Sequence, residues 1–198
     1  VNRLDNRSYN GAIGYPLPST EVALLDEQGQ PVAQGEAGEI AVRGPQVMAG
    51  YWKRPEETAK VMTPDGFFRT GDIGVMAADG LIKIVDRTKD MILVSGFNVY
   101  PNEIEQVVNL HPGVTECCAI GVPDERSGEA VKLFVVRKDY TLSEEDIANY
   151  CKEQLTGYKR PKYVEFREDL PMSNVGKILR KDLRDEELAA MARKKKAA

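Results

Sequence analysis

The sequence predicts an α+β fold in which a β-rich segment is followed by a segment of strands and helices. Up to residue 102, short apolar runs alternate with turns rich in glycine and polar residues, as in "EVALLDEQGQPVAQGEAGEIAVRG" at 21–44. From residue 102 onward, stretches with the apolar spacing of helices alternate with strand-like runs. The pattern changes near "DRTKDMI" at 86–92, so we expect the junction between the two segments there.

The first segment contains two further predicted elements. "RPEETAKVM" at 54–62 predicts a helix, because proline is favoured at the first helical position. "LIKIVD" at 81–86 follows the turn-forming "ADG" and predicts a strand.

The second segment contains three predicted helices. The first covers "NEIEQVVNL" at 102–110, with Asn102 as its cap. The second covers "SEEDIANYCKEQL" at 143–155, because Ser143 is a good cap and acidic residues fill the first turn. The third is a polar helix over 178–196. Strands are expected at 114–122, 130–136 and 162–166.

The composition is that of a soluble globular protein, with 198 residues, 42% of them hydrophobic and 29% charged. A net charge of -4 gives no support for nucleic-acid binding. No apolar run approaches the roughly 20 residues that span a bilayer, and the first residues do not have the pattern of a signal peptide, so we expect neither feature. The first residue is Val1 and strand-like sequence follows soon after it, so we expect a fragment of a longer protein.

The three cysteines are too few for a disulfide framework. Cys117 and Cys118 are neighbours on a predicted strand, so their side chains should face opposite sides of it. No CxxC motif occurs and His111 is the single histidine, which argues against a zinc site and against a Cys–His nucleophile. We expect reduced cysteines and a cytoplasmic protein.

Asp72 follows a predicted Thr-Gly turn in "DGFFRTGDIG" at 65–74. An aspartate at this place can cap a turn through its own backbone, which is the simpler interpretation. Its two carboxylate oxygens could instead accept hydrogen bonds from two vicinal hydroxyls, such as those of a ribose.

Other candidate positions are weak signals when each is taken alone. Arg87 and Lys89 read as surface charges, and Gly96 as a turn glycine. Lys177 follows a glycine, as in many phosphate-binding loops, but the earlier glycine and the following Ser/Thr of such a loop are missing. Taken alone, most lysines in loops of any kind are solvated and have no further role.

Taken together and in this order, the motifs resemble the adenylate-forming family of acyl-CoA synthetases, luciferases and peptide-synthetase adenylation domains. The long-chain fatty acid–CoA ligases of bacteria are the most similar class. The resemblance runs from about Gly11 to Arg184. The matching stretches are "GEIAVRGPQVMAGYW" at 38–52, "FRTGDIG" at 68–74, "DRTKDMILVSGFNVYPNEIE" at 86–105, "LTGYKRP" at 155–161 and "SNVGKILR" at 173–180.

The resemblance implies a two-step activity and a two-domain organisation. Such enzymes use ATP with Mg to convert a fatty acid into an acyl-adenylate, and then pass the acyl group to coenzyme A. Residues 1–88 would be the β-rich end of the large domain, and 89–198 the small α+β domain. The small domain would act as a lid that rotates between two poses, one for each half-reaction.

The resemblance also implies roles for six residues. Asp72 and Arg87 would bind the ribose of ATP, and Lys89 would be the hinge between the domains. Ser95 and Gly96 would line the coenzyme A tunnel, where a residue without Cβ permits close backbone approach. Lys177 would be the catalytic lysine of adenylation, a flexible cation delivered to the carboxylate and the α-phosphate.

The phosphate-binding loop, the Mg-ligating glutamate and the acyl pocket of the family are missing from this sequence. We therefore expect the chain to be inactive by itself. Alternatives are a free-standing module that binds coenzyme A or a carrier protein, an oligomerisation piece, and another family member such as an aryl-CoA ligase. The basic run "RKKK" at 193–196 could give weak peripheral attraction to the inner face of a membrane.

Overall fold

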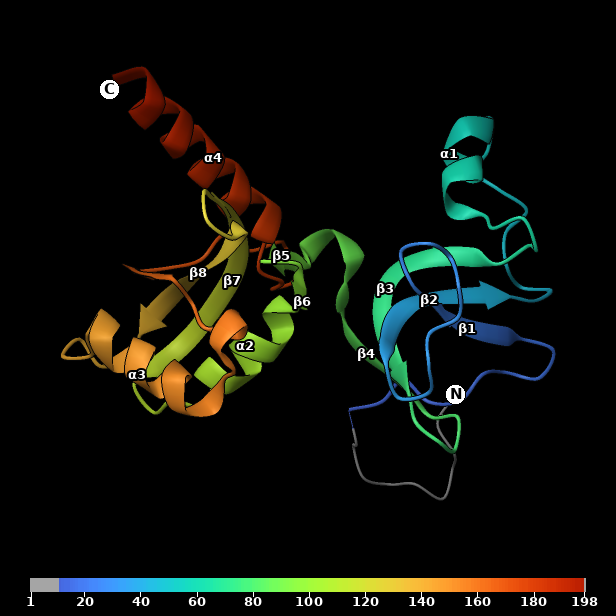
Figure 1. The fold of residues 1–198 in the computed structure, drawn as a ribbon, viewed down its shortest axis with the longest axis horizontal. Coiled ribbons are helices and arrows are strands. Elements are labelled where there is room, and N and C mark those ends of the chain that lie inside the picture. Colours follow the sequence, from blue (N-terminus) through green and yellow to red (C-terminus); the bar gives the residue numbers. More distant parts are fainter. Residues whose placement is uncertain (1–10, 198) are drawn as a thin grey trace. The chain divides into compact units, whose positions relative to one another are not determined.

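In the computed structural model, residues 11–197 are described, and side chains up to 193. The chain folds as two compact units, and the boundary between them in the sequence falls between Lys89 and Asp90 (Figure 1). The sequence-based boundary lies one residue earlier. Each unit has its own sheet and its own core.

The first unit is built on an antiparallel sheet of four strands in the order β1-β2-β3-β4. Helix α1 (Pro55–Val61) lies between β2 and β3 in the sequence and begins at the predicted proline. A small cluster of Leu24, Ile40 and Ile82 forms the apolar core of this sheet. The strands are β1 (Glu21–Leu25), β2 (Ala37–Arg43), β3 (Phe68–Met76) and β4 (Ile82–Arg87).

The second unit has a five-stranded sheet centred on β8. Strand β7 pairs along one edge of β8, while β5 and the parallel strand β9 share the other edge. Its strands are β5 (Ile92–Val94), β6 (Phe97–Val99), β7 (Val114–Asp124), β8 (Gly128–Arg137) and β9 (Tyr163–Arg167). Its helices are α2 (Pro101–Val108), α3 (Glu144–Gln154) and α4 (Arg180–Ala197), with 3-10 turns at Thr88–Asp90 and Gly157–Lys159.

The two faces of this sheet carry different helices. Cys117 packs in a core cluster with residues of α2 and α3, such as Ile104 and Ile147. Cys118 packs in a second cluster with Leu183 of α4. The prediction that the two cysteines face opposite sides is therefore confirmed. Because Leu183 is fully buried, truncating it to alanine should cost about 2–5 kcal/mol of unfolding free energy.

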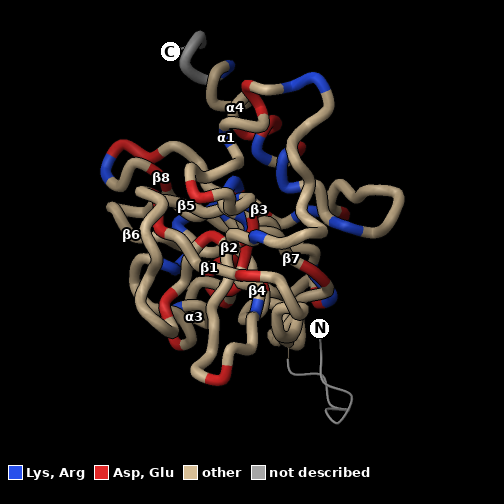
Figure 2. The backbone as a smooth tube through the Cα atoms, turned by 90° about the vertical axis from the view of Figure 1, so that its right-hand side faces the viewer, with Lys and Arg blue, Asp and Glu red and all other residues tan. Residues whose placement is uncertain are grey.

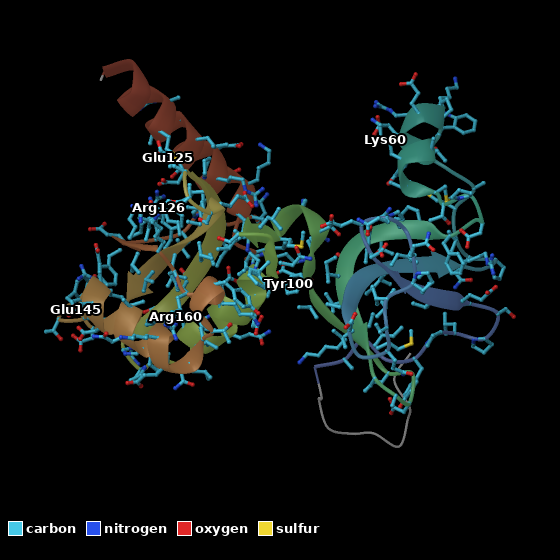
Figure 3. All side chains as sticks on the ribbon, viewed as in Figure 1. Lys60, Tyr100, Glu125, Arg126, Glu145 and Arg160 are labelled. Atoms are coloured by element: carbon cyan, nitrogen blue, oxygen red, sulfur yellow. The ribbon has the colours of Figure 1, made fainter. Side chains whose placement is uncertain are left out.

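Two predicted helix caps have different outcomes. Ser143 caps α3 as predicted, and its partner in the capping box is Asp146. Asn102 is not the cap of α2, because the helix begins one residue earlier at Pro101 and Tyr100 occupies the N-cap position (Figure 3). The side-chain oxygen of Asn102 instead accepts a hydrogen bond from Arg180.

Charged residues of both signs are interspersed along the described chain (Figure 2). Within the described residues, no helix is both long enough and apolar enough to cross a membrane.

Candidate functional site

Asp72 lies within strand β3, in a stretch where the pairing with β2 is irregular. The register between β2 and β3 shifts at this point, so residues 70–72 of β3 face the single residue Ile40. Gly71 adopts a φ of 77°, a left-handed conformation that glycine accepts without strain. The predicted Thr-Gly turn is therefore wrong, because the segment forms a β-bulge inside the strand.

The bulge is held by Glu39, a buried glutamate of β2. Its Oε2 atom lies 2.5 Å from Nη2 of Arg69, and its Oε1 atom accepts from the Gly71 N–H at 3.0 Å. Thr70 adds a hydrogen bond from its hydroxyl to the Ile40 carbonyl at 2.8 Å. Sequence reasoning assigned no role to Glu39. A charged residue inside an otherwise apolar strand was the available signal.

Asp72 and Arg87 face each other across β3 and β4. Asp72 Oδ1 lies 3.2 Å from Arg87 Nε, and the two side chains are 30% and 60% exposed respectively. The interpretation of Asp72 as a turn cap is wrong, because its carboxylate contacts the Arg87 guanidinium across the sheet. Since a carboxylate offers about four acceptor sites, this contact leaves oxygen lone pairs for a further donor.

Lys89 is exposed and lies in the short 3-10 turn at the end of the first unit. The next residue, Asp90, is buried, and its Oδ1 atom accepts from Nη2 of Arg184 at 3.2 Å. The junction therefore places an exposed lysine directly before a residue that is fixed to helix α4.

Ser95 and Gly96 form the two-residue turn between β5 and β6. Their φ values are 51° and 85°, the signs that a type I′ hairpin turn requires. The Ser95 N–H donates to the Ser127 carbonyl at 2.8 Å. A Cβ atom built on Gly96 meets no atom within 4 Å, so within this unit backbone conformation, and not crowding, favours glycine.

Lys177 lies at the end of a tight loop that precedes α4. The loop is closed by hydrogen bonds from Ser173 N–H to the Lys177 carbonyl at 2.8 Å and from Leu179 N–H to the Pro171 carbonyl at 2.8 Å. The Lys177 N–H also donates to Ser173 Oγ at 3.1 Å. The backbone of Lys177 is thus fixed on both sides, while the residue itself is exposed.

The structure brings Asp72 and Arg87 into contact within the first unit. Lys177, Ser95 and Gly96 belong to the second unit. Among the described residues, no group of three or more His, Cys, Asp or Glu side chains is placed to hold a metal ion.

The three cysteines are free thiols and all are buried. Burial raises the pKa of Cys151 to about 11, and it raises the pKa values of Cys117 and Cys118 further. The thiols therefore stay protonated near neutral pH, which makes them poor nucleophiles and poor metal ligands.

Comparison with known proteins shows which proteins this chain resembles. Residues 1–52 match the model of the AMP-binding enzyme family, and residues 103–177 match that of the AMP-binding enzyme C-terminal domain. The long-chain-fatty-acid–CoA ligase of Escherichia coli O157:H7 is 60% identical over 186 residues, which are 94% of this chain and 33% of that protein.

Two other proteins are also similar to this chain. The feruloyl-CoA synthase of an Amycolatopsis species is 46% identical and matches 88% of this chain. The crystal structure of ATP-bound MatB from Rhodopseudomonas palustris superposes with a TM-score of 0.87 at 40% identity and covers 93% of this chain. The chain spans 33% to 37% of the length of these three relatives.

Proposed function

Because the chain belongs to the AMP-binding enzyme family, we propose that it forms part of an AMP-forming long-chain fatty acid–CoA ligase. The substrates would be a fatty acid, ATP and coenzyme A. The observation that carries the proposal is the presentation of Lys177, an exposed cation on a loop whose backbone is fixed by hydrogen bonds. The identity of 60% to a long-chain ligase supports the choice of a fatty acid.

The proposed reaction has two steps. In the first, a carboxylate oxygen of the fatty acid attacks the α-phosphorus of ATP, and the bond to pyrophosphate breaks. In the second, the thiol of coenzyme A loses its proton and attacks the acyl carbon, and AMP leaves. Two anions approach each other in the first step, so a cation such as Lys177 would stabilise the charge that develops there.

Asp72 and Arg87 would hold the ribose of ATP. The carboxylate of Asp72 is partly exposed and already oriented by Arg87, so it can accept from ribose hydroxyls without first being repositioned. Glu39 would maintain the shape of the bulge, and the bulge would in turn fix the direction of the Asp72 side chain.

The remaining predicted roles concern the movement between the two steps. Lys89 would be the hinge, since it is exposed at the junction of the two units. Ser95 and Gly96 would form the wall along which coenzyme A passes. We assign no metal role to the described residues, because they contain no cluster of metal-ligating side chains. Mg would enter bound to ATP.

An aromatic acid is the second candidate substrate, because feruloyl-CoA synthase is 46% identical to this chain. Acyl-adenylate formation measured with palmitate and with ferulate would separate the two. If the segment only binds coenzyme A, the Lys177→Ala change should leave the rates of both half-reactions unchanged.

We also propose a cytoplasmic location, supported by three cysteines that remain free thiols. Weak attachment to the inner face of the membrane through residues 193–196 would be salt-sensitive. Cell fractionation at low and high salt tests both points.

The decisive experiment separates the two half-reactions in a full-length ligase that carries this segment. Lys177→Ala should slow ATP–pyrophosphate exchange by about 10²–10³-fold, the cost of losing one preorganised electrostatic donor. Thioester formation from supplied acyl-adenylate should change little, because the lysine acts before that step. Equal loss in both half-reactions would mean that Lys177 is structural, and the proposed function would then lose its main support.

A further inference from the structure

Helix α4 begins only three positions after Lys177 in the sequence, and its first residue is Arg180. Arg180 Nη2 lies 2.5 Å from Glu105 Oε2, and its Nε donates to Oε1 of the same carboxylate at 3.3 Å. The Arg180 Nη2 atom also donates to Asn102 Oδ1 at 2.5 Å. Arg180 is therefore bound to two residues of helix α2.

Glu105 is itself fixed to the sheet. Its Oε1 atom accepts a hydrogen bond from the Ala119 N–H of β7 at 2.8 Å. The side chains of Arg180 and Glu105 are only 20% and 13% exposed. A charge pair with so little exposure and several hydrogen bonds holds its partners in one geometry, and removing one partner leaves a largely buried charge.

This pair ties the first residue of α4 to α2, directly after the loop that carries Lys177. Residues 173–177 are closed into a compact turn by their own hydrogen bonds, so the turn moves as a unit with the start of the helix. The loop is fixed to the rest of the unit through buried Leu170 before it and through Arg180 and buried Leu183 after it.

We propose that Arg180 is a positioning residue for Lys177, acting through Glu105. This inference rests on the proposed function, in which the Lys177 ammonium must reach reacting oxygens. Rates of oriented reactions depend steeply on placement, and a displacement of about 1 Å can cost about 10²-fold. Arg180 would supply this accuracy by tying the lysine loop to the α2–β7 framework.

The test uses Arg180→Met, which keeps the aliphatic length and removes the guanidinium. In the full-length ligase, ATP–pyrophosphate exchange should fall by about 10–100-fold. Thioester formation from supplied acyl-adenylate should stay close to the wild-type rate. In a Lys177→Ala background the same change should cause no further loss of exchange, because the group being positioned is already gone.

Arg167→Met is the matched control. Arg167 is a similarly covered arginine, 24% exposed, that joins β9 to Glu186 in a later turn of α4. It has no link to the start of the helix in the described contacts. Its loss should lower thermal stability and leave the ratio of the two half-reactions unchanged.

Three results would overturn the proposal. These are an unchanged exchange rate in Arg180→Met, an equal loss of both half-reactions, and a further loss of exchange in the Lys177→Ala background. If Arg180→Met does not fold, Glu105→Gln is judged by the same criteria, because it keeps the shape and removes the charge. A Lys177→Ala enzyme with normal exchange would instead refute the proposed function itself.

Discussion

Replacing Asp72 tests whether this segment helps to bind the nucleotide. Its carboxylate is 30% exposed and has one described ion-pair partner, Arg87 at 3.2 Å. Asp72→Ala removes both carboxylate oxygens. Asp72→Asn keeps the size and one acceptor oxygen, so its effect should be intermediate.

The expected effects of Asp72→Ala on the KM for ATP and on stability follow from the two roles that the carboxylate could have. A hydrogen bond to a charged group contributes about 1.5–3 kcal/mol, so losing the ribose contact should raise the KM for ATP about 10–100-fold. The ion pair with Arg87 is partly exposed, and such pairs stabilise folded proteins by about 0–1 kcal/mol. Asp72→Ala should therefore impair ATP use far more than stability.

The assay is acyl-adenylate formation at varied ATP, with the KM for coenzyme A and a melting curve measured alongside. Glu21→Ala is the matched control, because Glu21 and Arg43 form a cross-strand ion pair of 2.6 Å in the same sheet. The control should leave the KM for ATP unchanged.

The reasoning would be refuted by an unchanged KM for ATP together with a lowered melting temperature in Asp72→Ala. It would also be refuted if Glu21→Ala raised the KM for ATP as much as Asp72→Ala. Either outcome would mean that the Asp72–Arg87 pair only stabilises the sheet.

Three further predictions concern acid stability, the hinge and the chain alone. The pKa of Asp124 is held well below its ordinary value of 3.8, mainly by a hydrogen bond from Lys162 and secondly by one from Ser127. The contribution of the ionised carboxylate to stability is therefore present above about pH 4 and is lost on acidification. The stability advantage of the wild type over Asp124→Asn should therefore shrink as the pH falls, and a pH-independent difference in urea unfolding would contradict this. Lys89→Pro fixes φ near about −65°, so thioester formation should suffer more than adenylation, whereas a parallel loss would argue against a hinge. The 198-residue chain alone should show no ATP–pyrophosphate exchange with fatty acids, and measurable exchange would disprove this.

Gly96 is a less direct probe of the coenzyme A path than its sequence position indicates. Its φ of 85° means that most side chains would strain the turn, whatever passes beside it. To add a side chain beside the coenzyme A path with little strain in the turn, Gly96→Asn is the better substitution. Asparagine tolerates this backbone conformation more readily than other residues with a side chain.

The sequence by itself determined the local elements of this protein. The helix after Ser143 depends on a cap and an acidic first turn, and α1 on a proline at its start, all within a few residues of chain. The opposite orientations of Cys117 and Cys118 follow from the alternation of a strand. Such features were predictable because their causes lie within one or two turns of backbone.

Only the tertiary structure decided how distant residues support the candidate site. The bulge that contains Asp72 looked like a turn, because its hydrogen-bond acceptor, Glu39, lies on another strand 32 residues from Gly71. The side chain of Asn102 contacts Arg180 and does not cap its helix, and Glu105 meets Arg180 across 75 residues of sequence. These contacts depend on strand register and helix packing, which are set by the burial of whole faces and cannot be read from neighbouring residues.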